Sequence, residues 1–277
     1  MRFYQFWLRF RKNRAAEISF YCILIFVFLA LLAPWLSPYD PFALGQRPFL
    51  PPQSGHLMGT DDLGRDTLSR VLYGTRVSLM VGILAATTSL IIGTAVGSVS
   101  GYSGGFVDEL LMRATEYVLV IPRFFLALLI VAMMGTGITK IVLVIGFLDW
   151  PEIARVVRAQ FLTFKEREFV LAARAMGLKN WKIIFTEILP NAIPPAIVVG
   201  SFLVARAILL EAGLSFLGLG DPELISWGML LSDAQERIWF SMWLVIFPGL
   251  AMSLLVLSIN LFGDGINDVL NPRLKEK

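Results

Sequence analysis

The sequence has 277 residues, of which 56% are hydrophobic and 16% are charged, and its mean hydropathy is +0.71. A soluble globular domain is typically about 45–50% apolar and about 25% charged, so this composition excludes an ordinary soluble protein and a disordered chain. The net charge of +3 is too small to indicate a nucleic-acid partner. A transmembrane helix uses roughly 20 residues, and the chain therefore has room for about six spans with loops.

The residues that usually carry catalysis or bind metals are scarce. Cys22 is the only cysteine and His56 the only histidine, which excludes a disulfide within the chain and a Cys/His metal site. No G-x-x-x-x-G-K-[ST] phosphate loop is present, since the nearest segment, 135–140, has the wrong spacing. We therefore predict no catalytic residue, no metal site and no cofactor in this chain, so that energy for any transport comes from a partner or an ion gradient.

The chain begins with a basic segment, 1–17, followed by an apolar run over 18–36. This order is also the pattern of a secretory signal peptide. However, the run is too long for a typical signal core and no small-x-small cleavage site follows it. We therefore predict a tail over 1–17, an uncleaved first span over 18–36 and an outer loop over 37–76.

Five further apolar runs follow in the order of the chain. They cover residues 77–99, 117–134, 139–150, 191–212 and 243–262. The run 139–150 is the weakest, because it is short and carries Lys140 and Asp149. Together these runs predict an all-α membrane protein with six transmembrane helices, a core over 77–262 and a C-terminal tail over 263–277.

The distribution of basic residues predicts the orientation. With six spans, sixteen Lys and Arg residues lie in the two tails, after the second span and in the loop 152–189, against six in the opposite loops. Basic residues are enriched on the cytoplasmic side of membrane proteins. We therefore predict a multi-pass protein of the cell membrane with both termini and the loop 152–189 in the cytoplasm.

Two features lie in or before the second span. Gly93, Gly97 and Gly101 recur every four residues, which places them on one helix face and lets another helix approach closely. This stripe predicts helix packing, either static or sliding. The outer segment 59–70 mixes charges with Leu63 and Leu68, which fits a short helix on the membrane surface or a solvated loop.

The segment 165–190 predicts two short amphipathic helices in the cytoplasm. Gly177 ends the first helix, because glycine readily takes the left-handed conformation, and Asn180 is positioned to cap the second. The apolar residues of the second helix recur at helical spacing: Trp181, Ile184, Phe185 and Ile188. Two interpretations stay open from this pattern alone. The pair either lies on anionic lipid or docks into the groove of a soluble partner.

The same segment resembles the "EAA" loop of ABC importer permeases. Residues 171–177 read LAARAMG and 188–190 read ILP, and three more blocks resemble the peptide/nickel branch in the same order: GTDDLGRDTLSR at 59–70, SFLGLG with WG at 215–228, and NLFGD at 260–264. This resemblance implies the type I ABC importer permease fold and the second permease subunit of a dipeptide or oligopeptide system.

The sequence also departs from this family pattern. Leu171 stands where the family has Glu before Ala-Ala, Glu187 replaces an expected Ile, and Asn267 and Asn271 stand where Arg and Asp are usual. The first departure removes any salt bridge carried by that Glu, whereas the docking shape rests on Gly177 and the apolar stripe.

The resemblance implies roles for particular residues. ATPase coupling is assigned to Ala172, Ala173, Met176, Gly177, Trp181, Ile184, Phe185 and Pro190. The outer gate and the contact with a binding protein are assigned to Asp221, Glu223, Trp227 and Asp233. The implied partners are a sister permease subunit, two cytoplasmic ATPase subunits that use ATP and Mg, an extracytoplasmic substrate-binding protein and the lipid bilayer.

Two alternatives remain at the level of sequence. Nickel, glutathione or oligosaccharide importers share this architecture, so the peptide substrate rests on the resemblance alone. A secondary transporter or channel working alone is the other alternative. Ionisable residues inside spans serve as relays in such proteins, and the candidates are Arg123, Asp149, Arg206 and Glu211. All four lie near predicted span ends, where pairing at the membrane interface is the simpler explanation.

Overall fold

The computed structural model describes residues 7–8, 10–45 and 47–270, and the regular elements of these residues are helices. In chain order they are α2 (Arg14–Leu36), α3 (Thr67–Ser103), α4 (Gly105–Val120), α5 (Arg123–Met134), α6 (Ile138–Phe164), α7 (Glu168–Ala175), α8 (Asn180–Lys182), the π-helical turn η1 (Ile183–Ile188), α9 (Leu189–Phe216), α10 (Trp227–Ala234), the 3-10 turn η2 (Gln235–Arg237) and α11 (Trp243–Leu270). The predicted all-α fold is confirmed for this part of the chain.

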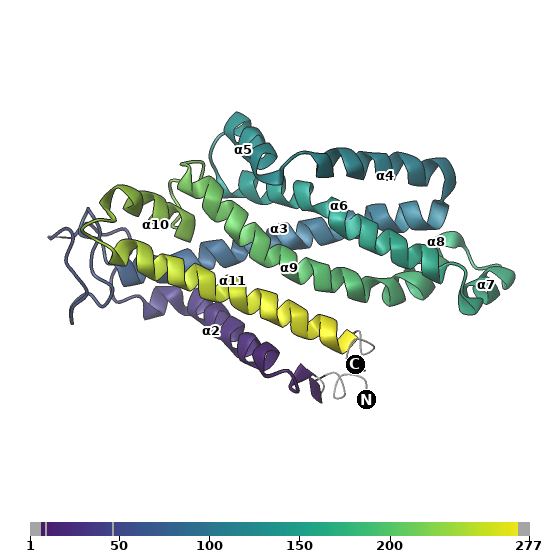
Figure 1. Cartoon of the computed structure of the whole chain (residues 1–277), viewed down its shortest axis with the longest axis horizontal. Helices are drawn as coiled ribbons and strands as arrows, with labels where there is room; N and C mark the ends of the chain where they lie inside the picture. Colours follow the sequence, from purple (N-terminus) through teal and green to yellow (C-terminus); the bar gives the residue numbers. More distant parts are fainter. Residues whose placement is uncertain (1–6, 9, 46, 271–277) are drawn as a thin grey trace.

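The long helices form an elongated bundle (Figure 1). Helices α7 and α8 lie at one end of the bundle, and α10 lies at the other end beside the connection between α2 and α3. Helices α3, α6 and α9 pack against one another, and α2 and α11 pack together along the opposite side. The side chain of Asn13, before α2, donates a hydrogen bond of 3.2 Å to Asp268 near the end of α11.

The predicted second span is longer than the apolar run. Helix α3 begins at Thr67, ten residues before the predicted start, because Asp66 caps it by accepting hydrogen bonds of 2.8 Å from the backbone N–H and the hydroxyl of Ser69. The first turns carry Arg70 and Thr75, which are polar and lower the mean hydropathy of this part of the helix. Both side chains are nevertheless buried. The predicted outer loop 37–76 therefore ends at residue 66.

The predicted third span over 117–134 is not one continuous helix. The region consists of α4 and α5, which meet at an angle of 88°. The break falls at Ile121 and Pro122, since proline has no N–H to continue the helical ladder and disfavours helical geometry in the residue before it. Arg123 is thus the first residue of α5, not a residue inside a continuous span.

The predicted fourth span, 139–150, is only the first half of a helix. Helix α6 continues through Pro151 to Phe164, so the predicted loop 152–189 begins within it. Four helices in the described residues are long and apolar enough to cross a membrane, or five if the bent α4–α5 pair counts as one span. The predicted count of six differs because α6 carries charged residues at positions 149, 152, 155 and 158.

The last two spans also continue beyond their apolar runs. Helices α8, η1 and α9 form one helical stretch from Asn180 to Phe216. Helix α11 runs to Leu270, which places the first residues of the predicted tail 263–277 in a helix, and residues 271–277 lie outside the described part of the chain.

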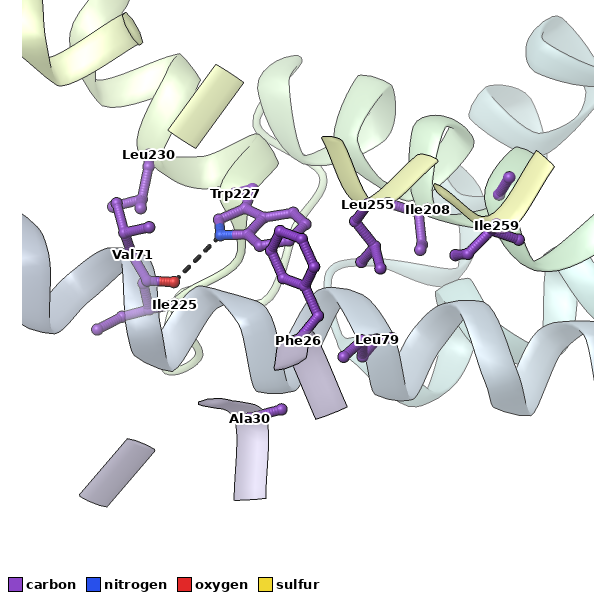
Figure 2. Close-up of a cluster of buried hydrophobic side chains, with 11 residues drawn as sticks. Phe26, Ala30, Val71, Leu79, Ile208, Ile225, Trp227, Leu230, Leu255 and Ile259 are labelled. Carbon is purple, nitrogen blue, oxygen red and sulfur yellow. Dashed lines mark hydrogen bonds between the residues drawn. The ribbon is translucent and has the colours of Figure 1, made fainter. Parts of the chain in front are cut away.

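A buried apolar cluster joins the N-terminal, central and C-terminal helices (Figure 2). Its members include Phe26, Val71, Leu79, Ile208, Trp227, Leu230, Leu255 and Ile259. Trp227 lies at its centre, with its indole N–H donating a hydrogen bond of 3.1 Å to the carbonyl of Val71. The ring of Phe26 packs edge-on against the indole at a centroid distance of 6.0 Å. This cluster packs α10 and the segment that precedes it against the long helices α2, α3, α9 and α11.

Candidate functional sites

Helix α7 ends in a hydrogen-bonded turn at Gly177. The backbone N–H of Gly177 bonds to the carbonyl of Arg174 at 2.9 Å, and the N–H of Leu178 bonds to that of Ala173 at 3.2 Å. These two bonds define a Schellman motif, whose turn residue must be left-handed. Gly177 has φ of +77°, and a Cβ placed there would meet no atom within 4 Å. Glycine is therefore needed at position 177 because of the left-handed backbone conformation, and not because a larger side chain would clash.

The second predicted helix differs from an amphipathic α-helix. Only Asn180–Lys182 form an α-helical turn, and Ile183–Ile188 form a π-helical turn that continues into α9. Asn180 is not the N-cap of this helix, because Lys179 occupies that position. The side-chain oxygen of Asn180 instead accepts a 2.8 Å hydrogen bond from the hydroxyl of Tyr102. Sequence reasoning could not detect the π-helical turn, since it assumed α-helical periodicity throughout.

The π-helical turn divides the predicted apolar stripe between core and surface. The five-residue spacing of Ile183 and Ile188 matches the i→i+5 bonding of a π-helix, and both side chains are fully buried. Ile184 is half-buried, whereas Phe185 is 60% exposed and Trp181 is 62% exposed. The stripe therefore presents two aromatic rings at the surface instead of one continuous apolar face.

Other predicted coupling residues lie at the same end of the bundle. Ala173 is buried beside Ile183 and Ile188 in one apolar cluster, and Ala172 is exposed. Met176 is 73% exposed. Pro190 lies in the first turn of α9 but does not start a separate helix. Five exposed apolar side chains lie on the segment 168–188, namely Phe169, Leu171, Met176, Trp181 and Phe185, and we call this set the apolar knob.

At the opposite end of the bundle, an ion-pair network joins the segment before α3 to α10 and η2. Arg70 on α3 pairs with Asp61 before the helix, and its other terminal nitrogen lies 3.2 Å from the carboxylate of Asp233 on α10. Arg65 adds a bond of 2.6 Å to Asp61, and Arg237 pairs with Asp62 at 3.2 Å. Asp233 thus holds α10 to the start of α3. The sequence analysis assigned Asp233 to the outer gate or the binding-protein contact, and it did not predict the ion-pair partners of this residue.

Two other predicted outer residues lie nearby. Asp221 accepts hydrogen bonds from the backbone N–H of Ile138, at 3.1 Å, and of Glu223, at 3.0 Å, so it ties this loop to the start of α6. Glu223 is exposed and available to a partner. Trp227 is different, because it is fully buried in the cluster of Figure 2. Trp227 therefore anchors α10 to the apolar cluster and offers no surface to a binding protein.

The outer segment 59–70 is neither a surface helix nor a freely solvated loop. Its first part folds through turns, and Thr67 begins α3. His56 lies beside it and bonds to the carboxylate of Asp66 at 2.9 Å. Among the described residues, no group of three or more His, Cys, Asp or Glu side chains is placed to hold a metal ion.

The three glycines of the predicted stripe lie against α6. A Cβ on Gly97 would be 2.5 Å from the carbonyl oxygen of Ala154, and similar overlaps would occur with α6 at Gly93 and Gly101. The absence of side chains on α3 therefore sets how closely these two helices approach.

A chain of charged residues links α5, α6 and α9. Arg123 bonds to Asp149 at 2.7 Å and to Glu152 at 3.0 Å, and Arg206 bonds to the other oxygen of Glu152 at 2.8 Å. Asp149 and Glu152 lie near the middle of α6 and not at a span end, because the helix continues to Phe164. Sequence reasoning missed Glu152, which it had assigned to a loop.

Arg206 lies at one side of an open groove between α6 and α9. The groove has a volume of about 590 Å³ and is lined by Glu152, Arg155, Val156, Ala159, Val199, Phe202 and Arg206. Glu211, further along α9, is separate and fully buried, and it accepts a 2.6 Å hydrogen bond from Ser215. The other carboxylate oxygen of Glu211 has no hydrogen-bond partner among the described residues.

These features define a helical membrane subunit with an apolar knob at one end and interlocked loops at the other. Residues 93–276 match the family described as "Binding-protein-dependent transport system inner membrane component", and residues 2–52 match "N-terminal TM domain of oligopeptide transport permease C". The chain therefore belongs to the inner-membrane permease family of binding-protein-dependent ABC transporters.

Curated relatives align along nearly the whole chain. A "Dipeptide transport system permease protein DppC" of Alkalihalophilus pseudofirmus is 40% identical over 268 residues, covering 96% of this chain and 88% of the relative. The oligopeptide permease OppC of Bacillus subtilis is 36% identical, with 97% and 89% covered. A glutathione permease, GsiD, of Pectobacterium atrosepticum is 37% identical, with 98% and 91% covered. The family resemblance in the sequence is thereby confirmed.

Solved structures support the fold. The MetNI methionine ABC transporter in inward-facing conformations aligns with a TM-score of 0.60 at 16% identity, covering 72% of this chain and 96% of that chain. An amino acid ABC transporter with histidines aligns with a TM-score of 0.54 at 16% identity, covering 71% and 92%. Both likenesses confirm the predicted fold of ABC importer permeases.

Proposed function

We propose that this chain is one of two permease subunits in an ATP-driven importer of dipeptides or oligopeptides. The proposal rests on relatives named for dipeptide and oligopeptide transport that align over 96% and 97% of the chain. A sister permease forms the other half of the pathway, and a substrate-binding protein delivers the peptide to the outer loops. A relative named for glutathione transport makes that tripeptide the principal alternative substrate.

In this proposal the apolar knob is the contact for the ATPases. Phe185 and Trp181 leave 60% and 62% of their surface uncovered by this chain, at the start of a helical stretch that continues into α9. Burying large apolar side chains is favourable by roughly 1.5–3 kcal/mol each, so the rings favour docking into a partner groove. Two ATPase subunits hydrolyse ATP with Mg in the cytoplasm, and their closure moves α9 through η1.

The outer loops act as the gate and the receptor for the binding protein. Glu223 is exposed, whereas Asp233 holds α10 to α3 through its bond to Arg70. We therefore assign the contact with the binding protein to Glu223, and the closure of the gate to Asp221 and Asp233. A cross-linker at position 223 should capture the binding protein in the docked state, and capture only at position 54 would contradict this assignment.

The test of the function is transport by the purified complex. Proteoliposomes that contain both permeases and the ATPases should import a radiolabelled dipeptide only with ATP, Mg and binding protein. Gly177→Val should keep the subunit in the membrane but separate import from ATP hydrolysis, because a β-branched residue at φ of +77° meets the left-handed backbone penalty of roughly 1–2 kcal/mol. Import by the unaltered complex of nickel or an oligosaccharide, but not of peptide, would refute the proposed substrate class.

A further inference from the structure

We propose that Arg155 and Arg206 form a carboxylate-binding site for the transported peptide, in the groove between α6 and α9. The inference rests on the proposed peptide-importing function and adds to it a substrate-contacting site within the membrane. It assigns the two arginines to the anionic end of the peptide and the apolar lining to its side chains.

The position of the charges argues that this groove does not face lipid. Glu152 lies near the middle of the 27-residue helix α6, and Arg206 is about 15 Å from the Phe216 end of α9 at 1.5 Å per residue. Ionisable side chains at such depth are costly in lipid and almost always face the interior of a bundle or a water-filled cavity. The groove therefore opens onto a protein-enclosed or aqueous space.

The hydrogen-bonding capacity of the groove favours an anion. Glu152 is satisfied, because one of its oxygens bonds to Arg123 and the other to Arg206. A guanidinium group carries five N–H donors, and the described contacts of Arg206 use only its Nη1 atom. Arg155 is exposed and forms no ion pair or hydrogen bond with the described residues. Two guanidinium groups thus retain free donors in one groove.

The free donors are of the kind that binds a carboxylate. Guanidinium groups bind carboxylates through paired N–H···O bonds, and Glu152 restrains Arg206 so that less side-chain freedom is lost on binding. Val156, Val199 and Phe202 supply apolar lining next to the arginines. A short peptide has this combination of a carboxylate end and side chains of varied character, whereas a lipid tail would leave the donors unsatisfied.

Transport by the complete complex in proteoliposomes tests the site. Arg155→Gln and Arg206→Gln should each lower import of a radiolabelled dipeptide about tenfold, while ATP hydrolysis stimulated by loaded binding protein stays within twofold of the unaltered complex. Arg206→Lys should recover part of the import. Arg113→Gln is the matched control, because it removes an exposed arginine paired with Glu109 on α4, outside the groove.

Three outcomes would overturn the site. Unchanged import in both glutamine variants would exclude a role for the arginines, and loss of the sister permease on purification would show that a carboxylate of that subunit fills the groove. Parallel loss of import and stimulated hydrolysis would indicate a structural role. Failure of the unaltered complex to import any peptide would instead refute the proposed function, and the site with it.

Cross-linking gives a second measurement that does not depend on rates. Benzoylphenylalanine in place of Phe202, which lines the groove, should cross-link to a labelled dipeptide during ATP turnover. The same probe in place of Ile197, an exposed residue of α9 outside the groove lining, should not. Labelling at position 197 without labelling at position 202 would contradict the groove as the peptide path.

Discussion

At the scale of single residues, exposure separates function from stability within the predicted coupling motif. The sequence pattern grouped Ile184, Phe185 and Ile188 as one apolar stripe, yet Ile188 is fully buried and Phe185 is 60% exposed. The extra residue in the π-helical turn causes this separation, because it rotates the following residues relative to an α-helix. Substitution of a buried residue in this turn should therefore lower the stability of the subunit, whereas substitution of an exposed neighbour should affect binding to a partner.

Phe185→Ala should leave the stability of the purified subunit almost unchanged but lower retention of the ATPases on purification. Its matched control is Ile183→Ala, which removes a fully buried side chain and should cost about 2–5 kcal/mol of stability. Thermal unfolding in detergent and ATPase content after affinity purification measure the two effects. Unchanged ATPase retention and stimulated hydrolysis in Phe185→Ala would favour the alternative in which the apolar knob lies on lipid.

At the scale of helices, the hydropathy of the sequence predicted the spans whose residues are mostly apolar. It did not predict the parts of helices that carry buried polar or charged side chains. Helices α2 and α11 contain the predicted runs 18–36 and 243–262. The second half of α6 was assigned to a loop because Glu152, Arg155 and Arg158 are charged, although two of them pair with other helices. Ion pairing between helices is not visible in one sequence. Pro122 indicated the bend between α4 and α5 in the sequence, but the prediction followed the continuous apolar run on both sides of this proline.

Gly97→Ala should separate α3 from α6 and destabilise the subunit by about 1–3 kcal/mol, the typical cost of overpacking. The added Cβ would lie 2.5 Å from the carbonyl oxygen of Ala154 and 2.8 Å from Cβ of Val157. Gly249→Ala is the control, because a Cβ there meets no atom within 4 Å and alanine favours a helix by about 1 kcal/mol. Thermal unfolding of both variants should give shifts of opposite sign, and equal shifts would contradict the packing argument.

Arg70→Met should loosen the outer loops, because it leaves the buried carboxylate of Asp61 with fewer partners and frees Asp233 from α3. Breaking a buried ion pair costs about 3–5 kcal/mol, whereas Arg113→Met breaks an exposed pair worth about 0.2–1 kcal/mol. Thermal unfolding compares the two variants. If both shift the midpoint equally, the outer network contributes no more than a surface pair.

At the scale of the whole molecule, the two ends of the bundle have different chemistry. One end carries the apolar knob, and the opposite end carries the ion-pair network around Arg70. Figure 1 shows α7 and α8 at one end of the bundle and α10 at the other. The two ends are connected by α3 and α9, which extend along most of the bundle. This arrangement allows a movement imposed on the knob to reach the outer loops through rigid helices. Composition predicted a membrane bundle, but the sequence alone could not show that the helices link these two ends.

The orientation of these ends is the remaining prediction, and single-cysteine labelling tests it in intact cells. The basic residues of the tails and of the segment that carries the knob, which are Lys165, Arg167, Arg174, Lys179 and Lys182, predict that the knob is cytoplasmic. In a Cys22→Ala background, Ser54→Cys should react with a membrane-impermeant maleimide added outside, whereas Asn180→Cys should react only after the cells are opened. Both positions are exposed in the subunit, so burial within it does not explain a difference. Reaction at position 180 in intact cells would show that the orientation is the reverse of the predicted one. The apolar knob could then not contact cytoplasmic ATPases.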